Sequence, residues 1–308
     1  MKTLRLTRLF VRYLLVNSAV RLLCVGLLTA SVGHSSENES MHGSCSDNSE
    51  SAVIAHPLKL LTLNVSHGRN TAINQLLVGK KKTFENLDAI SELLSLAGAD
   101  LVALQEADAA SRWSGGFDHV AYIAEQANYP CVVHGLHSTS WISSYGTALL
   151  THAEMLEPRS VQFEPSPPSK QKGYVSAQLT WQSNAGPVRI TVASVHFDFL
   201  GRKTRDNQVT EMVSELSSVD GPLVVLGDLN SEWLTDASDV QRIASELDLR
   251  PFGPDREDLG TYKKPTGSRL DWILISDDLE FEAYRVLPEV VSDHFAVYAE
   301  LNVREQPE

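Results

Sequence analysis

Short apolar runs alternate with polar segments along most of the chain, and their spacing predicts more strands than helices. Apolar runs predict buried strands at residues 58–65, 101–104, 146–150, 173–181, 188–196, 223–226, 270–275, 281–286 and 295–301. Apolar residues at helical spacing predict helices at 84–96, 205–216 and 238–247. So many buried strands require sheets packed face to face, with the helices outside them.

The first 33 residues follow a different pattern. A short apolar stretch at 22–32 follows a basic start that contains no acid, with the cations Lys2, Arg5, Arg8, Arg12 and Arg21. A basic start, a short apolar core and small residues before the cleavage point are typical of a secretory signal peptide. The alternative is an N-terminal membrane anchor, although the apolar stretch is short for a bilayer. We expect residues 1–33 to be removed and the protein to be exported, either to a periplasm or to the medium.

A polar segment separates this start from the rest of the chain. Residues 34–56 are rich in Ser, Glu, Asn and His, which predicts a flexible leader. Residues 57–304 show no second shift of composition and are expected to form one domain. Cys45 lies in the leader and Cys131 in the domain. In an exported protein they could form a disulfide, but two free thiols fit the sequence equally well.

The charge of the chain bears on its partners. Thirty-nine acidic residues against 26 basic ones give a net charge of −13, and removing the five cations of residues 1–33 leaves −18. Proteins that grip nucleic acid through its phosphates usually carry a basic stripe. Here the basic groups outside the start are short, at residues 80–82 and 202–205. We therefore expect no strong non-specific binding of nucleic acid.

Polar side chains stand at the ends of many predicted strands. Six strand ends carry a carboxylate, an amide or an imidazole: Asn64, Glu106, His196, Asp228 with Asn230, Asp271, and Asp293 with His294. One such residue is ordinarily a turn former. Six that converge would form a cup whose oxygen ligands suit Mg²⁺ or Mn²⁺. The chain shows no Cys/His cluster with the spacing of a structural zinc site.

The order of these blocks resembles the endonuclease/exonuclease/phosphatase superfamily of metal-dependent phosphoesterases. The resemblance covers residues 58–303 and rests on Asn64, Gln105-Glu106, His196, Gly227-Asp228-x-Asn230, Asp271 and Ser292-Asp293-His294. Each block alone is a weak signal, whereas all of them in this order form a strong one. The resemblance implies an α+β protein: a four-layer α/β/β/α sandwich with two packed mixed β-sheets.

The resemblance also implies roles for the residues of the cup. The implied metal ligands are Asn64, Glu106 and Asp293, and the implied catalytic residues are His196, Asp228, Asn230, Asp271 and His294. His294 would contact the phosphate while Asp271 fixes its ring, and Asn230 would hold the phosphate. His196 would lie opposite, as a donor to the phosphate or as a general acid. Asp228 would orient or deprotonate the attacking water. Members of the superfamily differ on whether the base corresponds to Asp228 or His294, and the sequence leaves both open.

The superfamily cleaves DNA, RNA, phosphoinositides, sphingomyelin and smaller phosphoesters. We expect a monomeric, exported phosphodiesterase that acts on lipid head groups or small phosphoesters. The alternatives are a secreted nuclease and a non-catalytic binding module, and the intact Glu106, Asp228 and His294 argue against the module. Contact with lipid would favour an exposed aromatic rim, for which Trp113, Trp141 and Trp233 are candidates.

Overall fold

A computed structural model describes residues 41–45, 53–263 and 267–305. The predicted signal peptide, residues 1–33, lies outside the described residues. Within the described part of the chain, every helix is too short or too polar to cross a membrane.

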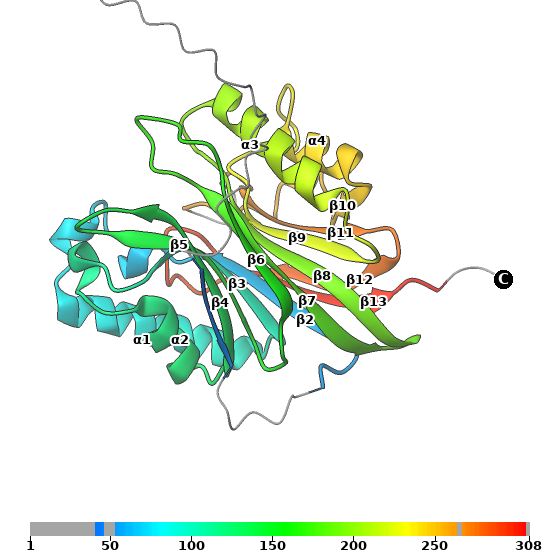
Figure 1. Cartoon of the computed structure of the whole chain (residues 1–308), viewed down its shortest axis with the longest axis horizontal. Coiled ribbons are helices and arrows are strands. Elements are labelled where there is room, and N and C mark those ends of the chain that lie inside the picture. Colours follow the sequence, from blue (N-terminus) through cyan, green and yellow to red (C-terminus); the bar gives the residue numbers. More distant parts are fainter. Residues whose placement is uncertain (1–40, 46–52, 264–266, 306–308) are drawn as a thin grey trace, which may run out of the picture. The chain divides into compact units, whose positions relative to one another are not determined.

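The strands form two sheets (Figure 1). The first sheet has seven strands in the order β1 (Met41–Cys45), β4 (Cys131–Thr139), β5 (Ser144–Thr151), β3 (Leu101–Asp108), β2 (Leu58–Asn64), β13 (Val297–Val303) and β12 (Leu279–Val286). The second has six, in the order β10 (Leu249–Pro251), β11 (Asp271–Ser276), β9 (Leu223–Asp228), β8 (Gly186–His196), β7 (Gly173–Ser183) and β6 (Leu156–Gln162). The pairs β2–β3 and β8–β9 are parallel and the other pairs antiparallel, so both sheets are mixed.

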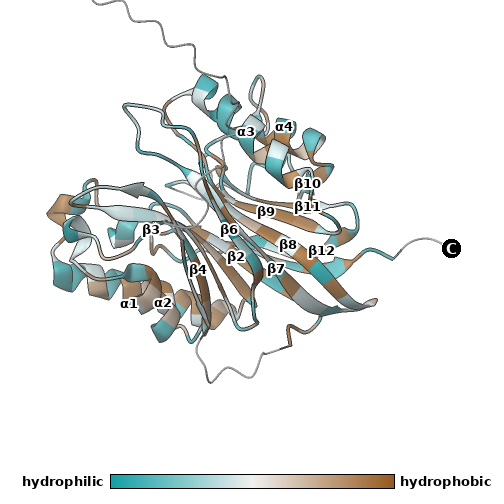
Figure 2. Cartoon of the chain, in the orientation of Figure 1, coloured by the Kyte–Doolittle hydropathy of each residue, from teal (hydrophilic) through white to brown (hydrophobic). Residues whose placement is uncertain are grey.

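Helices cover the outer face of each sheet. Helices α1 (Lys80–Ala97) and α2 (His119–Gln126) pack on the first sheet, and α3 (Arg202–Leu216) and α4 (Asp239–Glu246) on the second. Between the sheets lies a third apolar core that includes Leu60, Leu149, Trp181 and Ile273. Figure 2 shows this division as apolar strands with mostly polar outer helix faces. The predicted four-layer α/β/β/α sandwich is confirmed.

The predicted elements are present, and the additional ones had weak patterns. Strand β4 was not predicted because polar and small residues interrupt its apolar run at His134, Gly135 and His137. Strand β6 is mostly exposed at the edge of its sheet and contains Pro158, so it has no buried alternation. Helix α2 has only eight residues, which is too short for a clear periodicity. The 3₁₀ turns η1 (Ser66–Gly68), η2 (Gln75–Leu77) and η3 (Arg112–Ser114) complete the loops near the site.

The flexible leader predicted at residues 34–56 is wrong for its described parts. Met41–Cys45 forms β1, which pairs antiparallel with β4, and a disulfide joins Cys45 to Cys131 at the first residue of β4. Ile54 is buried and bridges to Trp181. Composition gave no sign of this, because the covalent bond and the backbone pairing hold residues that are mostly exposed. The pairing left open by the sequence is therefore made.

Three glycines, one each in β4, β5 and β7, lie against a buried histidine. A Cβ atom added to Gly135, Gly146 or Gly173 would lie within 3.0 Å of the ring of His137. The Nε2 atom of His137 lies 2.9 Å from the hydroxyl of Thr147, whereas its Nδ1 has no partner among the described residues. Burial, reinforced by the neighbouring His134 and Lys172, lowers the pKa of His137 to about 3.

This histidine is expected to make the fold sensitive to acid. The unfolded chain binds a proton below the ordinary pKa of 6.5, whereas folded His137 stays neutral down to about pH 3. The free energy of unfolding should therefore fall as the pH drops through this window, with His137 contributing about 1.4 kcal/mol per pH unit. Urea unfolding at pH 7 and pH 5 should show a shallower loss for His137→Gln than for the parent. Equal losses in the two proteins would remove His137 as the cause.

Candidate active site

The predicted polar strand ends meet at one end of the sandwich, opposite the β7–β8 hairpin. Strand register brings residues distant in sequence into direct neighbourhood. Asn64 pairs with Gln105 across β2 and β3. Asp228, the last residue of β9, lies opposite His196 on one side and Asp271 on the other. His294 enters from the segment before β13. The two sheets thus contribute to a single cup.

Strained backbone aims several of these side chains. The pairing of β3 with β5 shifts register between Leu104 and Ala107, which marks a bulge at Gln105-Glu106. Glu106 has a φ of 49° and Asn230 a φ of 47°, and His67 is left-handed as well. Such conformations cost on the order of 1–3 kcal/mol each and persist where the surroundings enforce them. Bulges next to active sites re-aim side chains, and here the bulge turns Glu106 away from the ladder.

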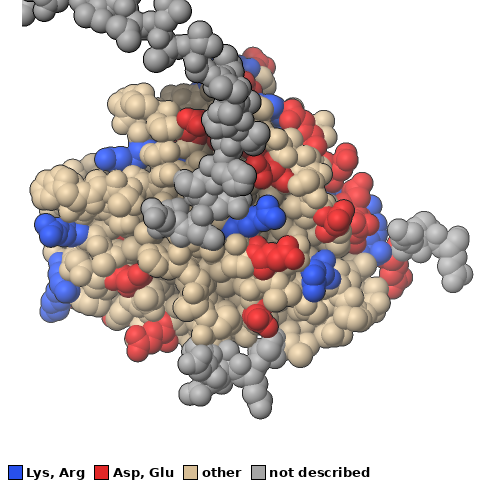
Figure 3. All heavy atoms as spheres, viewed as in Figure 1, with Lys and Arg blue, Asp and Glu red and all other residues tan. Residues whose placement is uncertain are grey.

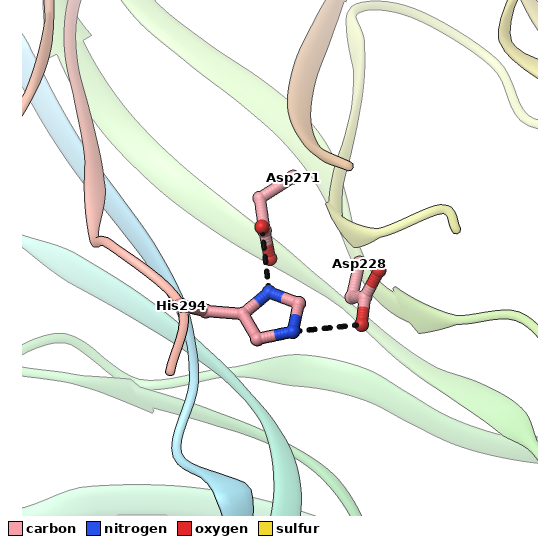
Figure 4. Close-up of side chains that lie close together, drawn as sticks. All are labelled: Asp228, Asp271 and His294. Atoms are coloured by element: carbon pink, nitrogen blue, oxygen red, sulfur yellow. Dashed lines mark hydrogen bonds and ion pairs between the residues drawn. The ribbon is translucent and has the colours of Figure 1, made fainter. Parts of the chain in front are cut away.

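Three buried side chains form a line across the cup (Figure 4). The Nδ1 atom of His294 donates to Asp271 Oδ2 at 2.8 Å, and its Nε2 lies 3.9 Å from Asp228 Oδ2. Burial opposes a charge on the imidazole. The carboxylates of Asp271 and Asp228 outweigh it and raise the pKa of His294 to about 10. His294 is therefore protonated at neutral pH.

Asp228 has the opposite perturbation. Burial raises its pKa to about 7, and the nearby Asp271 adds to this effect, although His294 opposes it. Asn64 Nδ2 donates to Asp228 Oδ2 at 2.9 Å, and the backbone amide of Asn230 donates to Oδ1 at 3.0 Å. The side-chain amide of Asn230 donates to the carbonyl oxygen of Phe197 at 2.9 Å. Hydrogen bonds therefore fix the orientation of the Asp228 carboxylate, whose pKa of about 7 lies near neutral pH.

Glu106 sits among cationic and imidazole side chains. Its carboxylate oxygens lie 3.4 Å from His67 Nε2, 3.6 Å from Lys172 Nζ and 3.9 Å from His196 Nε2. Burial alone would raise the pKa of Glu106, but His67, Lys172 and their neighbours together hold it well below its usual range. Glu106 is therefore an ionised carboxylate that faces an excess of positive charge.

Two of these neighbours lacked a strong signal in the sequence. Lys172 is buried and its Nζ lies 3.2 and 3.0 Å from the two ring nitrogens of His196, but it belongs to a polar loop segment that predicts nothing about a site. His67 lies three residues after Asn64, in a turn whose sequence does not point to a site. In the structure, its Nδ1 lies 2.7 Å from Asp108 Oδ1, so it links Asp108 to Glu106. Burial and Lys172 lower the pKa of His196 far below its ordinary value, so this imidazole is neutral.

Asp293 lies in a separate ion pair at the edge of the cup. Arg69 Nη2 donates to Asp293 Oδ2 at 2.9 Å, and the hydroxyl of Ser66 donates to Asp293 Oδ1. Asn64 Oδ1 in turn accepts from the amide of Ser66 at 3.0 Å. The short segment after β2 therefore ties the predicted ligands Asn64 and Asp293 together.

A buried group at the centre of the cup could hold a metal ion once His294 loses its Nε2 proton. Ligand atoms of Asp228, Asp271 and His294 lie within 4.8 Å of one another. Asp271 Oδ1 is buried and has no hydrogen-bond partner among the described residues, so one carboxylate oxygen remains free for a ligand. This trio differs from the predicted ligands Asn64, Glu106 and Asp293, although Asn64 contacts Asp228 directly. Carboxylate and amide oxygens dominate both sets, as divalent Mg²⁺ and Mn²⁺ require.

Further residues hold the site from outside. The amide of Gln105 donates to Thr62 and to Ser194, each at 3.1 Å, and so connects the two sheets beneath the cup. Gln208 accepts from the backbone amide of Asp198 at 2.9 Å, and Arg205 pairs with Asp239, which together shape the loop after His196.

A layered sandwich with this cup of acids, amides and imidazoles defines a class of phosphoester-cleaving proteins. The family model described as Endonuclease/Exonuclease/phosphatase family matches residues 61–294. The chain belongs to this family, whose members are phosphoester hydrolases, and the expected membership is confirmed.

Solved structures agree in fold at low sequence identity. An endonuclease/exonuclease/phosphatase from Beutenbergia cavernae is 18% identical with a TM-score of 0.62, covering 80% of this chain and 71% of that one. The Bacteroides thetaiotaomicron mannosyl-6-phosphatase Bt3783 is 16% identical with a TM-score of 0.58, covering 79% and 99%. D. rerio TDP2, complexed with a single-strand DNA product, is 15% identical with a TM-score of 0.59, covering 80% and 100%. No curated protein sequence matches the chain significantly.

Proposed function

We propose that this protein is a divalent-metal-dependent phosphodiesterase that hydrolyses lipid head groups or small phosphoesters by in-line attack of water. The observation that carries this proposal is the buried line Asp271–His294–Asp228, which faces Asn64 and Glu106 in one cup. It combines a charged donor, a carboxylate that titrates near neutral pH and oxygen ligands for a cation. A non-catalytic module would have no need to bury so many ionisable groups.

The cation would be Mg²⁺ or Mn²⁺, held by Glu106 with Asn64 and Asp293. Ionised Glu106, and the oxygens of Asn64 and Asp293 that Ser66 ties together, are the features of this cup that fit such an ion. When bound, the ion neutralises phosphate charge and stabilises the leaving oxygen.

The residues of the chain divide the remaining work. Asp228 accepts a proton from the attacking water, because its pKa of about 7 suits a base at neutral pH. Protonated His294, held by Asp271, donates from Nε2 to a phosphoryl oxygen as charge builds there. A bond forms between the water oxygen and phosphorus, and the bond to the ester alcohol breaks. The departing oxygen takes a proton from solvent, and Asp228 then releases the proton it accepted. Of the two bases left open by the sequence, this favours Asp228.

Lys172 and neutral His196 would hold the phosphoryl group from the opposite wall. We predict that Lys172→Met lowers kcat/KM for a phosphodiester by about 10- to 100-fold, as for loss of one preorganised donor. Lys172→Arg should restore part of the loss because it keeps the charge. Exposed Lys170, two residues earlier, offers the matched control, and Lys170→Met should behave as the parent. Equal rates for Lys172→Met and the parent would leave Lys172 with a structural role only.

Substrate choice is tested by a panel at low salt with Mg²⁺ or Mn²⁺. The panel would contain plasmid DNA, RNA, sphingomyelin, phosphoinositides and bis-p-nitrophenyl phosphate. The chain should cleave a lipid or small diester faster than duplex DNA, because gripping a duplex takes a row of Lys and Arg contacts along its phosphates and the basic groups at 80–82 and 202–205 are short. Plasmid nicking faster than hydrolysis of every lipid and small diester would favour the nuclease instead. Full turnover in the presence of EDTA would contradict the proposed requirement for a divalent metal ion.

We also propose that the protein is exported. The basic and apolar start supports this, and so does the Cys45–Cys131 disulfide, since such bonds persist in oxidising compartments. Mass spectrometry of protein from the native host should show loss of residues 1–33. Intact Met1 in a membrane fraction would support the anchor.

A further inference from the structure

Exposed apolar side chains gather at the end of the sandwich that carries the cup. Ten large hydrophobic side chains are exposed among the described residues, and eight of them lie in loops at the catalytic strand ends: Ile73, Leu76, Leu77, Trp141, Phe199, Leu200, Leu234 and Val290. The other two, Val53 and Leu96, lie at the opposite end, beside the Ile54–Trp181 bridge and in the last turn of α1. Scattered surface hydrophobics are normal, but this concentration is not.

Strand directions place six of these residues around one half of the mouth. Ile73, Leu76 and Leu77 follow β2, whose last residue is Asn64, and η2 contacts η3, which follows β3. Trp141 lies in the turn before β5, whose second residue pairs with Asp108 beside Glu106. Phe199 and Leu200 follow His196. Ile73 is 97% exposed and Trp141 80%, so the side chains project into solvent.

Basic side chains share the same half of the mouth. All are exposed and all open helices at this end: Lys80, Lys81 and Lys82 in α1, Arg112 in η3, and Arg202 and Lys203 in α3. Figure 3 shows basic side chains at the left edge of the molecule, where α1 begins in Figure 1. Leu234 and Val290, in contrast, adjoin Asp236 and Glu289. We call the six apolar and six basic residues together the apolar–basic rim.

An anionic lipid bilayer matches this composition. Apolar side chains enter the boundary between head groups and acyl chains, and Lys and Arg contact the negative surface around them. A nucleic acid would match the cations but not the aliphatic side chains, because bases stack on aromatic rings. Four of the six apolar residues are Ile or Leu. The phosphate of a phospholipid lies in the head-group layer, just above the acyl chains. If the apolar side chains enter that boundary, the cup that they surround lies next to the phosphates.

We propose that the apolar–basic rim docks the protein on an anionic phospholipid bilayer and so presents head-group phosphodiesters to the cup. The hydrolysis of these lipids rests on the proposed function, whereas the docking does not. Water would cleave the head-group diester into a phosphomonoester and an alcohol, the same balanced step as above.

Flotation with vesicles of phosphatidylcholine and phosphatidylglycerol in equal parts tests the docking. The protein without residues 1–33 should float with these vesicles and less with pure phosphatidylcholine. The triple variant Ile73→Ser, Leu77→Ser, Trp141→Ser should bind about tenfold more weakly or worse, since three anchoring side chains lose their apolar surface. A matched control, Val53→Ser with Leu96→Ser, removes exposed apolar residues from the opposite end and should float as the parent does.

Hydrolysis of bis-p-nitrophenyl phosphate separates the two proposals. The rim variant should keep this soluble activity, because its three residues lie outside the cup, while its activity on vesicle lipid falls. Absent flotation of the parent, or equal flotation of parent and rim variant, would overturn the docking even if the soluble diester is cleaved. A parent that is dimeric without vesicles and made monomeric by the triple variant would assign the rim to a second copy instead. Flotation without cleavage of any diester would support the docking and contradict the proposed function.

Discussion

Glu106→Gln is expected to lower the turnover of a phosphodiester by about 10³-fold or more, in line with the loss of a principal metal ligand. Glutamine keeps the size of the side chain and removes the charge that His67, Lys172 and His196 now surround. The measurement is kcat for bis-p-nitrophenyl phosphate across a titration of Mg²⁺. A raised requirement for Mg²⁺ should accompany the lost rate, because the oxygen donor becomes neutral.

Glu85 on the exposed face of α1 supplies the control for this result. Glu85→Gln removes an exposed carboxylate that pairs with Lys82 on the surface, and it should leave kcat and the Mg²⁺ dependence as they are. A Glu106→Gln protein as active as the parent at the same Mg²⁺ concentration would show that the cation, if needed, binds elsewhere. The buried group of Asp228, Asp271 and His294 would then be the site to test next.

His294→Ala should lower kcat by about 10²-fold or more, as expected for a group that stabilises charge in the transition state. Asp271→Asn should cause a smaller loss, because it removes only the partner that orients the ring and supports its charge. His56→Ala, at an exposed position before β2, should have no effect on kcat. Steady-state rates of the three variants and the parent under saturating Mg²⁺ give the comparison.

The order of the two losses is the informative part. If Asp271→Asn kept full activity while His294→Ala lost it, the 2.8 Å contact between them would have no role in turnover. A loss for Asp271→Asn larger than for His294→Ala would instead favour Asp271 as a direct ligand, in agreement with its Oδ1 atom, which lacks a hydrogen-bond partner in the described part of the chain.

Much of the fold followed from the sequence because its signals are local. Each predicted strand is an apolar run, and six polar residues of the cup lie within two residues of the start or end of such a run. Asn64, Glu106, His196, Asp228, Asp271 and His294 were all readable in this way, and the structure brings them into one cup. Their roles in catalysis remain predictions.

The residues that were missed depend on tertiary neighbours. Lys172 reads as a loop lysine, and only the fold of β7 against β8 places it beside His196. His67 was missed for the same reason, because its place in the site depends on contacts with Glu106 and Asp108 on the neighbouring strand β3. Cys45 lies 86 residues from Cys131 in the sequence. A strand in a polar segment that is held by so distant a partner has no periodicity from which it could be predicted.

Strand β1 also has a consequence for how the protein can be handled. It covers the open edge of β4 from Cys131 to Gly135, and exposed edges of this kind are templates on which other chains add strands. A shortened protein that begins at residue 57 would keep the whole family match but leave this edge bare and the thiol of Cys131 unpaired. Such a protein is expected to self-associate on storage. Light scattering in the presence and absence of a reductant would distinguish edge pairing from disulfide exchange.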